Sequence, residues 1–205
     1  MHLIPDDIDV LDLIAQLTAR GAASFKILAE DFRLDLLEEA RGYPYTSLPE
    51  VVGNGDNIVK QQMARFNEFS AHSKYILLKD SFQAWLAGEL NRLGEDPFVY
   101  PLDLNSYELV KYEPGSLGIT PHRDGFRYRN IICIFIIAGH GRFYTCADRS
   151  GKDAVEIDAS PGNVILMRAP GFIGPGERPF HFVKDIQTTR YVFGLRQKVK
   201  KRSQD

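Results

Sequence analysis

Short β-rich segments separated by turns that contain glycine or proline make up the second half of this chain. Seven of them follow the Glu95-Asp-Pro-Phe98 turn, over residues 105–113, 131–138, 142–147, 154–158, 162–168, 179–186 and 189–199. This spacing is typical of an antiparallel sandwich or barrel, because a βαβ protein would alternate its strands with helices of about 10–15 residues. The sequence therefore predicts an antiparallel β-barrel in the C-terminal half.

The first half carries apolar residues at helical spacing. Residues 6–41 fit two successive helices, capped by Asp6 or Asp7, interrupted at Gly21 and stopped by Gly42. Two more helices are predicted further along the chain, over residues 57–70 and 74–93.

These patterns predict an α+β fold in a chain of 205 residues, which is long enough to bury a sizeable core. The predicted parts are a helical layer packed on the barrel at residues 1–95, a β core at residues 96–199 and a basic tail at residues 200–205. The formal net charge is −2, so no global field attracts nucleic acid or an acidic membrane.

No segment of the sequence is typical of a membrane or secreted protein. No apolar run approaches the roughly 18 residues that cross a bilayer, and the acidic start Met1-His-Leu-Ile-Pro-Asp-Asp lacks the basic region of a signal peptide. The two cysteines are too few for a disulfide framework, and Cys133 lies in an apolar run typical of a core. We therefore expect a cytoplasmic protein with reduced thiols.

A His-x-Asp pair, His122 and Asp124, follows a loop rich in proline and glycine. Residues i and i+2 of one strand share a face, so both side chains are able to reach one ion. His181 lies in a later apolar segment, where Phe180 and Phe182 are expected to point the other way, into a core. Two histidines and one carboxylate are the ligand set of a non-haem Fe(II) centre with open positions. In the alternative interpretation, one histidine is a surface residue and the other is hydrogen-bonded in the core.

The last predicted strand carries two arginines, Arg190 and Arg196, at an even spacing. Both therefore lie on one face of that strand, with Val192 and Gly194 between them. Inside a small barrel, two guanidinium groups are unfavourable unless they meet anions, which suits a carboxylate co-substrate that is held bidentately. In the alternative orientation, both arginines are solvated and the apolar residues between them point inward.

Together these residues resemble the Fe(II)- and 2-oxoglutarate-dependent dioxygenases, and the likeness covers about residues 105–199. The family pattern His-x-Asp…His…Arg falls on His122, Asp124, His181 and Arg190. Within the superfamily, Tyr112-Glu-Pro-Gly115 and the spacing from Arg190 to Arg196 look most like AlkB-type enzymes.

The resemblance implies a double-stranded β-helix, or jelly roll, that binds Fe(II), 2-oxoglutarate and O2. It implies three iron ligands, namely His122, Asp124 and His181. By the same resemblance, Arg190 would pair with the far carboxylate of 2-oxoglutarate and Tyr112 would hydrogen-bond the same group. Arg196 would lie near the co-substrate or the substrate.

Two features depart from the AlkB type. The asparagine expected two residues before Tyr112 is Val110 here, and the gap from His181 to Arg190 is shorter than in the DNA-repair members. The resemblance therefore supports the cofactors better than it supports a nucleic-acid substrate.

Four further residues are candidates for substrate contact. Arg127, Tyr128 and Arg129 directly follow the His-x-Asp pair and are expected to ring the mouth of the site, unless they form a solvated turn. Arg168 ends a strand before the glycine-rich loop 171–178, and it either contacts the substrate or forms a structural ion pair. The loop itself is either a lid or a plain connection.

The leading hypothesis is a dioxygenase that oxidises a C–H bond of a small molecule and releases succinate and CO2. The near-neutral charge favours this over an AlkB-type demethylase of alkylated nucleic acid, whose binding would weaken steeply with salt. A third hypothesis is the hydroxylation of a protein side chain, with the N-terminal helices as docking surface. A hypothesis from a different class is a non-enzymatic jelly-roll binding protein, in which the three ligand-type residues are accidental.

Overall fold

The computed structural model describes residues 8–94 and 96–199. The helices are α1 (Val10–Arg20), α2 (Glu30–Arg41), the 3-10 helix η1 (Gly55–Asn57) and α3 (Lys74–Leu93). The strands are β1 (Ala22–Lys26), β2 (Thr46–Ser47), β3 (Val51–Val52), β4 (Val59–Gln62), β5 (Ala64–Phe66), β6 (Ser106–Tyr112), β7 (Gly118–His122), β8 (Tyr128–Ala138), β9 (Arg142–Cys146), β10 (Val155–Ile157), β11 (Asn163–Arg168), β12 (Phe180–Lys184) and β13 (Arg190–Lys198). The expected helix caps Asp6 and Asp7 and the tail at residues 200–205 lie outside the described residues.

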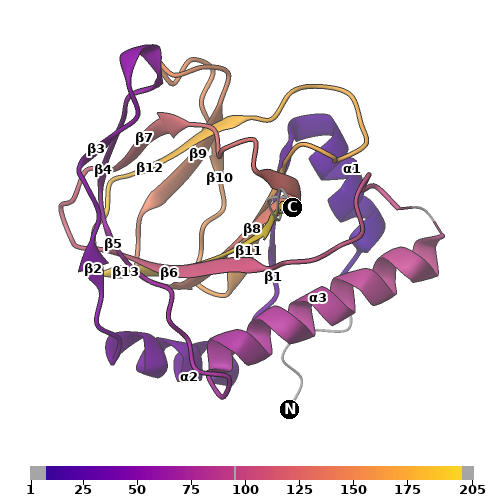
Figure 1. Cartoon of the computed structure of the whole chain (residues 1–205), viewed down its shortest axis with the longest axis horizontal. Helices are drawn as coiled ribbons and strands as arrows, with labels where there is room; N and C mark the ends of the chain where they lie inside the picture. Colours follow the sequence, from indigo (N-terminus) through magenta and orange to yellow (C-terminus); the bar gives the residue numbers. More distant parts are fainter. Residues whose placement is uncertain (1–7, 95, 200–205) are drawn as a thin grey trace, which may run out of the picture.

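The strands form two antiparallel sheets that face each other (Figure 1). One sheet has seven strands in the order β1-β11-β8-β13-β6-β5-β2, and the other has six in the order β10-β9-β12-β7-β4-β3. From β6 onward the chain passes back and forth between the two sheets, which is the winding of a jelly roll. The predicted antiparallel jelly-roll core is confirmed.

Alternate residues of the seven-stranded sheet belong to two different cores. On β8, Ile131, Cys133 and Phe135 pack against the helices, whereas Ile132 and Ile136 point between the sheets. A strand that is buried on both faces needs apolar residues at every position. This explains the continuous apolar run in the sequence of β8, and it places Cys133 in the core as predicted.

The α-helices cover the outer face of the seven-stranded sheet (Figure 1). α2 and α3 run along this face, and α1 lies against β1. The Asp9 carboxylate caps α1 by accepting from the Asp12 backbone N–H at 3.0 Å, and Gly21 ends the helix with a φ of 78°. The helices therefore leave the inner face of this sheet, between the two sheets, to form the site.

Two segments that were predicted to be helical are strands. The chain over residues 57–70 contains the end of η1 followed by β4 and β5, and residues 22–26 form β1, which pairs with β11. In β4 the burial alternates, with Val59 and Gln61 inward, so the period is that of a strand. The N-terminal part of the chain therefore contributes strands to both sheets and is not a helical layer alone.

In the described part of the chain, no helix is long and apolar enough to cross a membrane.

Gly118 permits the close approach of β7 to β12 and gives the first testable prediction. Its φ is 76°, and a Cβ there would lie 2.1 Å from the carbonyl oxygen of Val183. We expect Gly118→Ala to lower the free energy of unfolding by about 3 kcal/mol or more, because the clash is with backbone. Urea denaturation monitored by circular dichroism measures this change.

Gly115 provides a matched control for Gly118. Its φ is 74°, yet a Cβ there would meet nothing within 4 Å. Gly115→Ala should therefore cost only the conformational strain, about 1–2 kcal/mol. Equal losses in the two variants would show that the contact between β7 and β12 is unimportant.

Candidate metal centre

The two histidines of the site lie opposite each other on neighbouring strands. His122 at the end of β7 pairs in register with His181 on β12, and their ring centroids lie 4.2 Å apart. The Phe143 ring stacks on His181 at 5.7 Å. Pairing between these two strands thus brings together residues that are far apart in the sequence.

Asp124 completes the cluster from the turn after β7. The expectation that one strand carries both His122 and Asp124 is wrong, because β7 ends at His122. Ligand atoms from His122, Asp124 and His181 nevertheless all lie within 4.8 Å of one another. The structure therefore brings the three predicted ligands to one point, while their role as ligands stays a prediction.

Burial sets the protonation of this cluster. It lowers the pKa of His122, and it lowers the pKa of His181 to about 3, so both imidazoles are neutral near pH 7. Burial also raises the pKa of Asp124, but the Arg196 charge opposes this effect and the pKa lies below its usual value. The cluster thus offers two neutral imidazoles and one carboxylate.

One hydrogen bond orients the His122 ring, and another holds the backbone at Asp124. His122 Nδ1 lies 2.9 Å from the carbonyl oxygen of Thr120, which fixes the proton on Nδ1 and leaves Nε2 as the electron-pair donor. Arg178 Nη1 donates to the backbone oxygen of Asp124 at 2.6 Å. Arg196 Nε lies 3.5 Å from Asp124 Oδ2 and forms an ion pair with it.

A cavity of about 570 Å³ opens in front of the cluster, between the two sheets. Arg190, Val192, Gly194 and Arg196 all line it from β13. The intervening Phe193 is fully buried on the helix side of the sheet, in the core formed with α3. The predicted inward orientation of both arginines is therefore confirmed, and the solvated alternative is wrong.

Arg190 is buried in this cavity without a carboxylate partner among the described residues. It is 1% exposed, and burial lowers its pKa to about 10. Its Nη1 donates to the Gly141 carbonyl oxygen at 2.6 Å, whereas Nε and Nη2 have no hydrogen-bond partner in the described part of the chain. A buried guanidinium with two unsatisfied donors is unfavourable, and it fits a ligand that supplies a carboxylate.

Tyr112 lies opposite Arg190 on the neighbouring strand β6. Burial raises the pKa of Tyr112 to about 12, although the Arg190 charge opposes this rise, so the phenol stays protonated and can donate. Both residues line the cavity. The donor set of the triad and the unsatisfied guanidinium together fit a ferrous ion and a dicarboxylate.

The candidates for substrate contact divide into two groups. Arg127 and Tyr128 line the cavity, whereas Arg129 does not and packs over the Tyr100 ring at 5.5 Å. Arg168 donates to the backbone oxygens of Thr18 at 3.2 Å and Glu177 at 2.8 Å. The predicted alternative of an ion pair for Arg168 is wrong for the described residues, because its partners are backbone oxygens, while substrate contact by Arg168 stays a prediction.

Phe180 and Phe182 do not point into a core as expected. Both are partly buried, and Phe182 stacks on Tyr144 at 4.8 Å. The guanidinium of Arg123 lies 4.1 Å above the Phe180 ring. β12 belongs to the six-stranded sheet, and the helices α2 and α3 of the described chain lie instead along the other sheet (Figure 1), so the outward side chains of β12 remain partly in solvent.

Sequence reasoning missed Glu108, which faces the cavity from β6. Its carboxylate lies 2.9 Å from Arg196 Nη1 and 3.9 Å from Arg65 Nη1. Glu108 stands two and four residues before Val110 and Tyr112, so strand alternation puts all three on one face. That alternation was the signal that would have revealed it.

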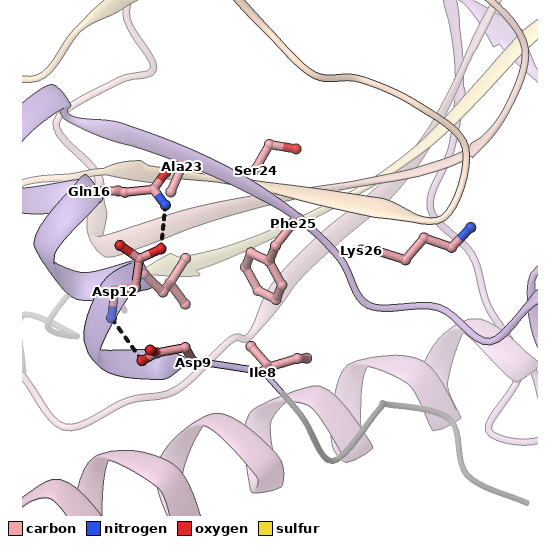
Figure 2. A pocket seen from close by; sticks show the side chains of 9 residues that line it. Ile8, Asp9, Asp12, Gln16, Ala23, Ser24, Phe25 and Lys26 are labelled. Carbon is pink, nitrogen blue, oxygen red and sulfur yellow. Dashed lines mark hydrogen bonds between the residues drawn. The ribbon is translucent and has the colours of Figure 1, made fainter.

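A separate hollow of about 490 Å³ lies between α1 and β1 (Figure 2). Among the described residues its lining includes Asp9, Asp12 and Lys26 but no histidine. Asp9 caps the helix, and Asp12 accepts from Gln16 Nε2 at 2.6 Å (Figure 2). Its carboxylates thus serve local helix structure, and the hollow is no candidate for the metal centre.

No protein-family model matches the sequence, and no curated protein matches it. Solved structures do match. A prolyl-4-hydroxylase from Pseudomonas putida matches with a TM-score of 0.59 at 16% identity, over 94% of this chain and 100% of that chain. A prolyl hydroxylase from Trichoplax adhaerens, in complex with a hypoxia inducible factor oxygen degradation domain peptide fragment, gives 0.63 at 14% identity over 94% of each chain.

A 2OG-Fe(II) oxygenase family oxidoreductase from Burkholderia pseudomallei also matches, with a TM-score of 0.61 at 12% identity over 93% of this chain and 90% of that chain. At such identities the likeness shows that this chain shares the fold of these three structures. The closeness to AlkB-type enzymes that the motifs indicated stays a prediction.

The contact between Arg196 and Asp124 gives the second testable prediction. Removing the guanidinium in Arg196→Gln leaves the effect of burial on Asp124 uncompensated, so the pKa of Asp124 should rise. A metal ion competes with protons for this carboxylate. We therefore expect the pH at which half of the bound Co(II) is lost to move upward, as measured by titration of the Co(II) visible absorption.

The matched control for this experiment is Arg65→Gln, which removes a guanidinium 3.9 Å from Glu108 on the exposed side of the same network. The pH midpoint of this control should stay close to that of the wild type. An unchanged midpoint in Arg196→Gln would contradict the assigned cause of the lowered Asp124 pKa.

Proposed function

We propose that this protein is an Fe(II)- and 2-oxoglutarate-dependent oxygenase. The observation that carries the proposal is the cluster of His122, Asp124 and His181 in one cavity with the buried guanidinium of Arg190, two of whose donors lack a partner among the described residues. Two neutral imidazoles and a carboxylate suit ferrous iron. An unsatisfied buried guanidinium suits the far carboxylate of 2-oxoglutarate.

Each residue of the cavity has a separate role in this proposal. His122 Nε2, His181 and Asp124 hold Fe(II), and Arg190 and Tyr112 bind and orient the co-substrate. Arg196 keeps Asp124 ionised and its carboxylate in place through the contact at 3.5 Å. The apolar wall formed by Ile134, Phe143 and Val183 excludes water from the reacting groups.

The bound iron and co-substrate supply an O2-derived oxidant for a C–H bond, with release of succinate and CO2. The chain positions the substrate carbon in front of the cluster and limits access to it. The small-molecule substrate expected from the net charge remains one candidate. A protein side chain is the second, because the cavity adjoins another hollow along the surface and the structural neighbours include prolyl hydroxylases.

Anaerobic addition of Fe(II) and 2-oxoglutarate tests the proposal directly. The wild type should develop the visible charge-transfer band of the chelate, and His122→Ala and Asp124→Ala should lose it. A wild type without this band, or an undiminished band in both variants, supports instead the non-enzymatic jelly-roll binding protein. A screen that measures succinate production would then identify the substrate.

Arg190→Ala should separate the binding of the co-substrate from the binding of the metal. Loss of the buried guanidinium should weaken 2-oxoglutarate binding by about 2–5 kcal/mol, roughly thirtyfold or more, and leave the affinity for Co(II) nearly unchanged. Isothermal titration with each ligand measures the two effects. Arg92→Ala, at the exposed end of α3, should change neither affinity.

A further inference from the structure

The mouth of the cavity, by which we mean the opening lined by Arg123 and Arg127, is positively charged although the chain as a whole is not. Beside the main cavity lies a second hollow of about 380 Å³, and Arg123 lines both. Among the described residues, seven arginines and three carboxylates line the two hollows together. The formal net charge of the chain is −2, so the lining of the two hollows is more positive than the chain as a whole.

The second hollow extends the site along the surface, away from β4 and β5. It is bounded by Phe126 and by the loop from Arg168 to Arg178, which also contributes Gly171 and Phe172. Phe126 is 73% exposed, and the Arg178 guanidinium lies 4.2 Å above its ring. A substrate that filled both hollows would be longer than a metabolite and would meet apolar as well as cationic surface.

The arginines of the mouth are weakly neutralised. Arg127 is exposed, and in the described part of the chain its side-chain hydrogen bond goes to the Tyr128 hydroxyl at 3.2 Å, with no ion pair. Arg123 pairs with Glu177 at 2.7 Å, but the Glu177 side chain is 82% exposed. Such an exposed ion pair is worth little, so an incoming carboxylate is able to replace Glu177.

This pattern fits an acidic polypeptide better than a nucleic acid. A nucleic acid needs cationic contacts to several successive phosphates and a field that attracts a polyanion. Here two arginines, Arg123 and Arg127, lie at the mouth, and the exposed ring of Phe126 and the glycines of the loop suit apolar side chains and peptide backbone. The guanidinium group of an arginine binds a carboxylate through two parallel hydrogen bonds.

We propose that the substrate is a polypeptide segment that lies across both hollows and carries an acidic side chain near the oxidised residue. Arg127 and Arg123 bind that carboxylate, and Glu177 is the group it displaces from Arg123. The inference rests on the proposed function for the oxidation step, whereas the binding of the acidic segment depends only on the mouth.

Fluorescence anisotropy with three labelled probes tests the inference. The probes are an alternating alanine–glutamate peptide, the same peptide with glutamine in place of glutamate, and single-stranded oligothymidylate. The protein is saturated with Mn(II) and 2-oxoglutarate, so that Arg190 does not bind the probe. The glutamate peptide should bind about fivefold or more tightly than its glutamine counterpart.

Four variants complete the test. Two of them should change the affinity for the glutamate peptide in opposite directions, and the other two are controls. Arg127→Gln should weaken binding of the glutamate peptide about fivefold, and Glu177→Gln should strengthen it about threefold by freeing Arg123. The matched controls are Arg142→Gln and Glu156→Gln, which break another exposed arginine–glutamate pair away from the mouth. Neither control should change the affinity.

The inference is overturned if the glutamate peptide fails to bind, if both peptides bind equally, or if Arg127→Gln has no effect. Tighter binding of oligothymidylate than of the glutamate peptide would assign the mouth to nucleic acid instead. Repeating the titration without Mn(II) and 2-oxoglutarate separates the two proposals. Peptide binding that persists in a protein without the Fe(II) chelate band would refute the oxygenase and leave an acidic-peptide site.

Discussion

The antiparallel pairing of β7 with β12 is the interaction on which the site depends. It sets His122 opposite His181, so strand register brings the two imidazoles together. Gly118 permits the pairing, since its missing Cβ leaves room for the carbonyl of Val183. Only Asp124 comes from a turn, and Arg178 and Arg196 hold its backbone and its carboxylate. Ligands on strands, supported by a second layer of contacts, form a pre-organised site.

Arg190 and Arg196 lie on one face of β13, but their positive charges are compensated to different extents. Arg196 has Asp124 and Glu108 as counter-charges, and these raise its pKa although burial lowers it. Arg190 has no such counter-charge among the described residues, and its pKa falls. A buried charge without a partner is destabilising by several kcal/mol. The strand therefore carries one complete ion-pair network beside the cluster and one cation that an anionic ligand would complete.

The parts of this fold that followed from the sequence are those set by local patterns. The β core followed from short segments between turns, the burial of Cys133 from a continuous apolar run, and the shared face of Arg190 and Arg196 from a period of two. Residues 22–26 did not, because Phe25 and Leu28 fit a helical spacing while pairing with β11 decides the conformation. The ion pair considered for Arg168 did not follow either, because its partners are backbone oxygens of Thr18 and Glu177, which no side-chain pattern encodes.

The substrate prediction shows how a net charge conceals a local one. A value of −2 favoured a small molecule over a nucleic acid as substrate, yet in the described part of the chain seven arginines and only three carboxylates line the two hollows. Charges separated by more than about 10 Å are screened in physiological salt, so a substrate close to the mouth experiences the arginines and not the chain average. The fold brings these arginines together because the segment after β7 lies against the loop before β12. The first of these segments contains Asp124, and the second leads directly into β12, which carries His181. Substrate recognition and metal binding therefore depend on the same two segments.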